Sequence, residues 1–282
     1  MKERFSPMPF RRAVFTLIEL LVVIAIIGIL AGLILAVLAK AKDKGKGVAC
    51  MNNMNQMLKA NNTYSTDYGY YMPVYDSSTT GPGKAGKQWA GYSSVSTIDI
   101  TGDGFMLPYL NGNWKAMVCP DWKIEFDPKA VEGGVGYGYN VYGVGTWAYL
   151  DGVTSCYSSG GSLCGMKNSR ISQPSQTVAY ADIVAMGPTV TAVKGYVFLY
   201  PYYTVPGTGN KQTTIFSSLC SRGDNVQFRH NGLASAGWLD GHVSSERPTR
   251  LQSASWAREA KVGAFGPMDN SLYDPWDIPS GQ

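Results

Sequence analysis

The longest hydrophobic run in the chain lies near its N-terminus. From Leu20 to Ala39 no side chain is charged or strongly polar. A helix of that length spans about 30 Å, the thickness of a hydrocarbon core, whereas the apolar core of a signal peptide has only about 7–15 residues. Ala39-Lys40-Ala41 matches a signal-peptide cleavage pattern, so removal there is the alternative. The length of the run favours a membrane helix, which we place at residues 15–41.

Small residues recur along this run at spacings of three and four, which places them on one face of a helix. They are Ala25, Gly28, Gly32, Ala36 and Ala39. Gly28 and Gly32 form a G-x-x-x-G pair, a pattern that allows two membrane helices to approach closely. Chance is the competing explanation, because alanine and glycine are common in membrane helices.

Glu19 lies at the N-terminal edge of the same run. A carboxylate at the bilayer centre costs about 2.5–3.5 kcal/mol. Glu19 therefore either sits at the membrane interface or has a partner within the membrane.

The periodic pattern continues beyond the membrane segment. Val48, Met51, Met54 and Leu58 recur at three and four residues, which predicts an amphipathic helix over residues 42–66. Such an apolar face usually packs on the protein's own sheet. The polar stretch from Tyr64 and then Pro73 should end this helix.

The remaining residues, 67–282, alternate short apolar runs with clusters of Gly, Pro, Asn and Asp, as expected for strands joined by long loops. The strands predicted are Thr177–Val184, Gly195–Tyr203, Val226–His230 and Ala234–Leu239. Asn231-Gly232 between the last two predicts a tight hairpin. Segments 76–104 and 151–170 are interpreted as surface loops. The predicted fold class is α+β: a long N-terminal helix packed on an antiparallel sheet.

Composition narrows the function classes. The 33 glycines and 18 tyrosines fit a turn-rich, strand-rich body. The net charge of +4 comes from basic residues that crowd around the N-terminal helix, so the body is nearly neutral and nucleic acid is not an expected partner.

The five cysteines form no C-x-x-C pair, which argues against a structural zinc site. Cys156 and Cys164 flank a flexible loop and would form a disulfide if the body lies outside the reducing cytosol. Buried free thiols are the alternative.

Two clusters have residue types that could carry chemistry. His230 and His242 flank a predicted hairpin with Asp240, which permits metal or acid–base chemistry. The simpler interpretation, which we favour, is a hydrogen bond between His230 and Asp240 across the turn.

Asp99, Thr101 and Asp103 resemble the start of a calcium loop. Leu110 stands where a bidentate glutamate is needed, so a surface turn is favoured. With no nucleophile elbow and no phosphate loop, we expect neither an enzyme nor a cofactor.

Two arginines, Arg11 and Arg12, precede the run Phe15-Thr-Leu-Ile-Glu-Leu-Leu-Val-Val-Ile-Ala-Ile-Ile-Gly28. This segment resembles the processing signature of type IV pilins and type II secretion pseudopilins. The resemblance implies cleavage by prepilin peptidase between Val14 and Phe15, methylation of the new amine, and a cytoplasmic leader at residues 1–14. It also implies that Glu19 pairs with the amine of a neighbouring subunit, which would relieve two charges that are costly to bury alone.

The sequence departs from that family at two positions. Val14 stands where glycine or alanine is usual before the cut, and Ala36 stands where many members have proline, so the helix should continue without a kink. Four basic residues precede the helix and four follow it, so the positive-inside rule does not decide how the helix is oriented in the membrane. The resemblance implies that the helix lies in the bacterial inner membrane with a cytoplasmic N-terminus. The body would then lie in the periplasm or on the cell surface.

A second resemblance involves the C-terminal part. His230, nine intervening residues and Asp240-Gly241 match the H-X9-DG pattern of a group of prepilin-like proteins. Cys50 with Asn52 and Asn53, and Cys119-Pro120-Asp121, are also similar to residues of that group.

Together these patterns predict a pilin-like filament subunit whose partners are prepilin peptidase, copies of itself or other pilin-like subunits, and the inner membrane. The alternative is a singly anchored surface binding module that does not polymerise. Recovery of the chain in filaments would separate the two.

Overall fold

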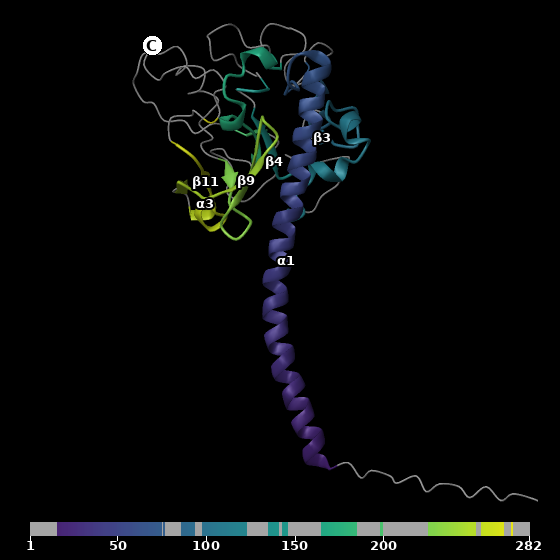
Figure 1. The fold of residues 1–282 in the computed structure, drawn as a ribbon, viewed down its shortest axis with the longest axis vertical. Coiled ribbons are helices and arrows are strands. Elements are labelled where there is room, and N and C mark those ends of the chain that lie inside the picture. Colours follow the sequence, from purple (N-terminus) through teal and green to yellow (C-terminus); the bar gives the residue numbers. More distant parts are fainter. Residues whose placement is uncertain are drawn as a thin grey trace, which may run out of the picture. The chain divides into compact units, whose positions relative to one another are not determined.

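The computed structural model describes residues 16–74, 76, 86–93, 98–122, 135–140, 143–145, 165–184, 198–199, 225–251, 255–267 and 272. The chain divides into two compact units, Met1–Lys42 and Asp43–Gln282. Helix α1, Leu17–Tyr68, begins in the first unit and ends in the second (Figure 1). The helix is uninterrupted, so neither Gly45 nor Gly47 breaks it. The expected end of the helix before Pro73 is confirmed.

The part of α1 that lies in the first unit is apolar and exposed. Its most apolar stretch of 18 residues has a mean hydropathy of 3.3, and none of that stretch is buried in the protein. Leu17 is 80% exposed and Leu33 is 65% exposed. This single helix is long and apolar enough to cross a membrane.

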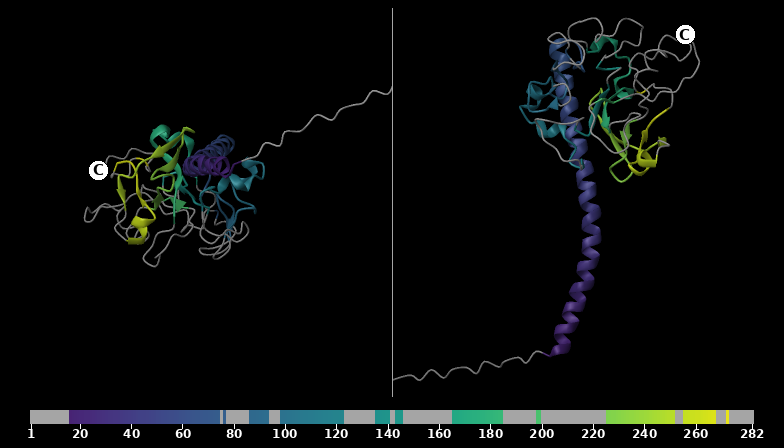
Figure 2. Two further views of the ribbon diagram at one scale, coloured as in Figure 1. Left: turned by 90° about the horizontal axis from the view of Figure 1, so that it is seen from below. Right: turned by 180° about the vertical axis from the view of Figure 1, so that it is seen from behind.

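The second part of α1 contributes the central helix of the body. Its buried residues are Cys50, Met54, Met57, Leu58, Ala60, Asn61, Tyr64 and Ser65. The predicted apolar face was partly wrong: Met54 and Leu58 are buried, but Val48 is 59% exposed and Met51 is half-buried. The buried face is rotated toward Cys50 and Met57 because the helix contacts strands on one side and the segment 98–122 on the other (Figures 1 and 2).

The described part of the body contains three sheets, and the largest has five strands in the order β6-β4-β5-β8-β9. Its strands are Phe198–Leu199 (β6), Tyr137–Asn140 (β4), Val178–Asp182 (β5), Ala234–Trp238 (β8) and Val243–Glu246 (β9). All of its pairs are antiparallel except β4 with β6, which is parallel. The α+β class is therefore confirmed. Each of the four predicted strand ranges contains a strand: β5, β6, β8, and Val226–Gln227 (β7).

The two smaller sheets have three strands each. One contains Gly86–Lys87 (β1), Tyr92–Ser93 (β2) and Ile98–Asp99 (β3); the other contains Arg250–Leu251 (β10), Val262–Ala264 (β11) and Val226–Gln227 (β7). The short helices are Leu107–Leu110 (η1), Trp114–Met117 (η2), Asn168–Arg170 (η3), Pro174–Gln176 (η4) and Ser255–Glu259 (α3). The prediction of a surface loop at 76–104 was wrong for its described part, because Trp89 and Ile100 are fully buried in the core.

Close packing of α1 on the sheet depends on a glycine. A Cβ atom at Gly237 of β8 would lie 2.9 Å from atoms of both Leu58 and Met54. Beside this contact, Tyr139 of β4 stacks on Tyr180 of β5 with ring centroids 4.9 Å apart, and Trp89 lies against both tyrosines. The core therefore joins the helix, the five-stranded sheet and the β1-β2-β3 segment.

Candidate functional site

The described part of the N-terminal segment begins with a helix cap. The side-chain Oγ1 of Thr16 accepts a hydrogen bond from the backbone N–H of Glu19 at 3.3 Å, and Glu19 Oε2 accepts one from the backbone N–H of Thr16 at 2.8 Å. The Thr16 hydroxyl also donates to the same oxygen. This reciprocal arrangement is a capping box. Glu19 therefore has a local role within the helix, which the Thr-x-x-Glu spacing could have predicted.

The small residues of the same segment face open space. An added Cβ at Gly28 or Gly32 would meet nothing within 4 Å, and Ala25 is exposed. The side chain of Ala36, and all of Val14 and Phe15, lie outside the described residues. Within the part of this face that the structure describes, nothing covers the small residues.

The H-X9-DG segment folds as two successive turns. Asn231 and Gly232 have φ angles of 55° and 84°, and His230 and Leu233 exchange both backbone hydrogen bonds around them. This is the tight hairpin that Asn-Gly predicts. The second turn, at Asp240-Gly241, connects β8 to β9, and Gly241 has a φ of 98°, a conformation that favours glycine.

The expected hydrogen bond between His230 and Asp240 is wrong. Asp240 Oδ1 instead accepts from the backbone N–H of His242 at 3.1 Å and lies 2.6 Å from His242 Nδ1. The His242 ring stacks on Trp238 with centroids 5.4 Å apart. Asp240 therefore fixes its own turn. His230 is buried in the body's interior, where its ring lies beside Asp182.

His230 lies among acidic and sulfur groups from two other segments, β5 and the residues that follow η2. Its Nε2 is 3.2 Å from Asp182 Oδ2 of β5 and 3.9 Å from Cys119 Sγ, and its Nδ1 is 3.7 Å from Asp121 Oδ2. Burial lowers the pKa of His230, but the hydrogen bonds to Asp182 and Cys119 outweigh it and raise the pKa to about 9. The imidazole is therefore held in its charged form.

Asp182 is fully buried and anchors this cluster to the sheet. Its Oδ2 accepts the backbone N–H of Ser235 at 2.7 Å, a bond between strands β5 and β8. Nearby, the Arg229 guanidinium donates to the carbonyl oxygens of Gly136 and Ile183 and lies 4.9 Å from the Trp122 ring centre. The His230 and Arg229 charges together balance the buried carboxylate.

Cys50 of α1 completes the cluster. Cys50 Sγ lies 2.7 Å from Cys119 Sγ, and both residues are buried. Burial raises the pKa of the Cys119 thiol, but hydrogen bonds from Cys50 and His230 and the charge of Arg229 outweigh it and lower the pKa overall. The pKa of Cys50 is raised, chiefly because its hydrogen bond to Cys119 favours the thiol form. Two buried cysteines thus face each other between the helix and the segment after η2.

The cluster contains the residue types of a Cys-His-Asp triad but not the geometry of one. In a triad the histidine faces the nucleophile with one ring nitrogen and the orienting acid with the other. Here Nε2 is the nitrogen nearest to both Asp182 and Cys119, and Asp121, the acid that faces Nδ1, is 3.7 Å away, beyond hydrogen-bond distance. Cys119 is only 1% exposed, so a substrate could not reach its sulfur. The contacts of this cluster join segments of the body that are far apart in the sequence.

Asparagine side chains attach α1 to both of its neighbours. Asn53 Nδ2 donates to the Val118 carbonyl at 3.0 Å, next to Cys119. On the sheet side, Asn55 and Asn62 donate to the carbonyls of Gly241 and Leu239, each at 3.3 Å. The helix is therefore hydrogen-bonded directly to the H-X9-DG turn.

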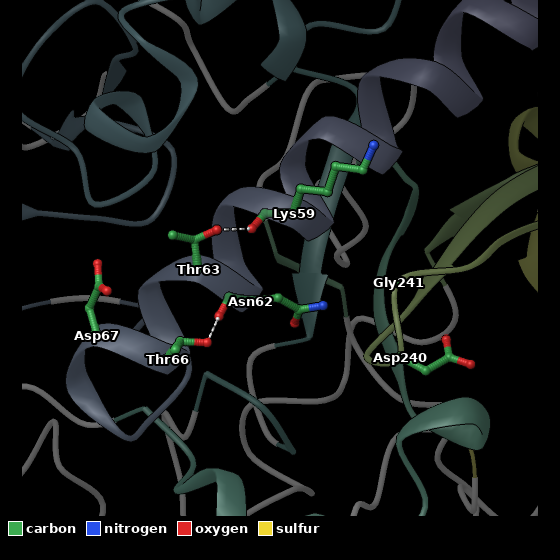
Figure 3. Close-up of a pocket in the computed structure, with 7 residues that line it drawn as sticks. All are labelled: Lys59, Asn62, Thr63, Thr66, Asp67, Asp240 and Gly241. Atoms are coloured by element: carbon green, nitrogen blue, oxygen red, sulfur yellow. Dashed lines mark hydrogen bonds between the residues drawn. The ribbon is translucent and has the colours of Figure 1, made fainter.

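A shallow groove of about 580 Å³ lies between α1 and this turn (Figure 3). Its lining residues are Lys59, Asn62, Thr63, Thr66, Asp67, Asp240 and Gly241. The hydroxyls of Thr63 and Thr66 donate to carbonyls one helical turn earlier, and Asp67 accepts from Tyr109. Most of its polar groups are thus engaged within the protein.

The proposed calcium ligands are already bonded to protein donors. Asp99 Oδ1 accepts from the backbone N–H and the hydroxyl of Thr101, at 2.9 and 2.7 Å. Asp103 pairs with the Lys87 ammonium group at 2.7 Å. These contacts favour the interpretation of the segment as a surface turn.

Sequence reasoning associated Cys50, Cys119 and His230 with one protein group but did not predict that they touch. Asp182 and Arg229 were missed altogether. Cys156 and Cys164, the predicted disulfide pair, lie outside the described residues. Comparison of the chain with protein-family models, with curated proteins and with solved structures finds no match.

Proposed function

We propose that this chain is a pilin-like filament subunit, anchored in the bacterial inner membrane and processed by prepilin peptidase. The N-terminus would be cytoplasmic and the body would lie in the periplasm or on the cell surface. The observation that carries the proposal is the single helix α1, whose first part is apolar and uncovered and whose second part is built into the body's core. A subunit of this kind assembles by packing such exposed helical segments together.

The surface of the exposed segment supports helix packing. Nothing lies within 4 Å of a Cβ added at Gly28 or Gly32, and the nearby apolar side chains of Ile29 and Leu33 are each 65% exposed. In a bilayer, close approach through small residues provides van der Waals contact between helices. A membrane anchor alone does not need this face.

Glu19 supports the proposal in spite of its capping role. Both side-chain bonds to Thr16 end on one oxygen, Oε2. An ionised carboxylate has about four acceptor sites. Glu19 can therefore cap its own helix and still accept the α-amine of Phe15 from a neighbouring subunit.

Intact-mass analysis tests the processing step of this proposal. The full chain is expressed with and without an active prepilin peptidase, and the expected product lacks residues 1–14 and carries one added methyl group on Phe15. Val14→Gly is the matched variant, because it restores the residue type usual before the cut and should be processed at least as fast. An uncut chain in both forms, despite active peptidase, would favour the anchored surface module.

A further inference from the structure

Cys50 and Cys119 meet although 69 positions separate them in the sequence. Their sulfur atoms lie 2.7 Å apart, nearer to the S–S bond length of about 2.05 Å than to the spacing of two thiols in ordinary contact. The residues are 0% and 1% exposed. The contact therefore lies in the interior, where the backbones of α1 and of the segment after η2 are both fixed.

Neighbouring bonds hold the same two segments in this register. Lys46 Nζ pairs with Asp121 at 2.9 Å, four positions before Cys50 and two after Cys119. Asn53 Nδ2 donates to Val118, the residue that precedes Cys119. Three successive contacts along α1 thus bring the two sulfurs together, so their approach does not depend on one side-chain rotamer.

A metal ion is the competing explanation, since Cys50, Cys119 and His230 offer ligand atoms within 4.8 Å of one another. Two thiolates on one tetrahedral zinc ion lie about 3.8 Å apart, given Zn–S bonds of about 2.3 Å. The observed 2.7 Å is too short for that arrangement. In addition, His230 Nε2, the nitrogen nearest to the sulfurs, is 3.2 Å from Asp182 and donates its proton there.

We propose that Cys50 and Cys119 form a disulfide bond that fastens helix α1 to the segment after η2. The bond forms when the thiolate of one cysteine attacks an oxidant disulfide, such as glutathione disulfide, and expels one glutathione thiolate. The second cysteine loses its proton and attacks the mixed disulfide, expelling the other. In total the two cysteines lose two protons and two electrons, and the oxidant is reduced to two thiols.

Burial determines when this reaction takes place. An oxidant cannot reach either sulfur in the folded body, so the bond forms before α1 has docked fully. Once formed, the disulfide is protected from reductants by the same burial. Thiol labelling of the native protein cannot test the proposal, because buried thiols and a disulfide both resist the reagent.

Peptide mapping of the denatured chain gives a direct test. The full chain is purified in detergent, refolded in a mixture of reduced and oxidised glutathione, and then denatured in an alkylating reagent without reductant. Trypsin cleaves after Lys46, Lys59, Lys115 and Lys123, and each of the resulting peptides, 47–59 and 116–123, contains one cysteine. The proposal predicts that these two peptides are recovered as one linked species, which separates on reduction.

The outcomes are distinct. Recovery of both peptides singly alkylated would overturn the proposal, and one equivalent of zinc bound to the folded chain before denaturation would replace it with a metal site. Cys50→Ser with Cys119→Ser should lose the linked species and melt about 10 °C lower, because the unfolded chain is no longer closed into a loop. Refolding in vitro does not depend on cellular location, so failure here would leave the proposed function untouched.

Discussion

His230 Nε2 lies 3.2 Å from the carboxylate of Asp182 in the interior of the body, whereas Asp240 bonds to His242. Asp182 in turn accepts the Ser235 backbone N–H, so the pair joins β5, β8 and the first turn of the H-X9-DG segment. The motif's histidine and aspartate therefore serve two different contacts: one holds the core, and the other shapes a surface turn.

The two histidines should differ sharply when replaced. His230→Ala removes the nearer of the two cations that balance the buried Asp182 carboxylate and should lower the free energy of unfolding by about 3 kcal/mol. His242→Ala is the matched control, because its ring is half exposed and bonds only to Asp240 in the described structure; it should cost less than about 1 kcal/mol. Urea denaturation of both variants measures the difference, and equal losses would show that the His230 pair has no structural role.

The pH dependence of stability follows from the raised pKa of His230. The folded-state pKa is about 9, against 6.5 for an ordinary histidine, so the stabilisation is fully present below about pH 6.5 and is lost as pH rises through about 9. If Cys119 is in the proposed disulfide, its negative charge no longer supports the imidazolium and the upper limit moves below pH 9.

Melting temperatures of wild type and His230→Gln, measured between about pH 6 and pH 9.5, provide the test. The advantage of wild type should shrink steadily over this window. A constant difference between the two proteins would mean that His230 does not titrate there.

Two glycines should respond in opposite ways to the same substitution. Gly237→Ala places a Cβ 2.9 Å from Leu58 and Met54 and should destabilise the body by about 1–3 kcal/mol. Gly45→Ala, in an exposed turn of α1 with nothing within 4 Å, should stabilise by about 0.5–1 kcal/mol. Thermal unfolding of the two variants checks both signs, and a neutral Gly237→Ala would contradict close packing of α1 on β8.

The elements predicted best were those that a pattern of adjacent residues in the sequence determines. The apolar run, the helix end before Pro73 and the Asn231-Gly232 hairpin each depend on a few adjacent residues, and all three are present. The Thr16–Glu19 capping box was equally local and was overlooked. These features follow from chain geometry alone.

The buried cluster could not be predicted because its contacts depend on strand pairing. Asp182 meets Ser235 only because β5 pairs with β8, and Cys50 meets Cys119 only because α1 packs against the segment after η2. A single sequence gives no measure of which strands pair. For the same reason His230 was assigned to Asp240, its partner in the motif, rather than to Asp182, its neighbour in space.

The central claim is that Glu19 pairs with a neighbouring subunit, and the capping box allows this role to be separated from a local one. Glu19→Gln keeps a side chain that can cap the helix but removes the charge. Thr16→Ala removes the reciprocal cap but keeps the charge. Both chains should still insert in the membrane, because the apolar run is unchanged.

The most direct measurement is the amount of each chain in sheared filaments relative to the membrane fraction, in cells with active prepilin peptidase. Pairing between subunits predicts that Glu19→Gln is processed and inserted but missing from filaments, since the Phe15 amine would be buried without its partner. Thr16→Ala should be incorporated nearly as well as wild type. Normal incorporation of Glu19→Gln, or a loss confined to Thr16→Ala, would contradict the pairing and leave Glu19 only as a helix cap.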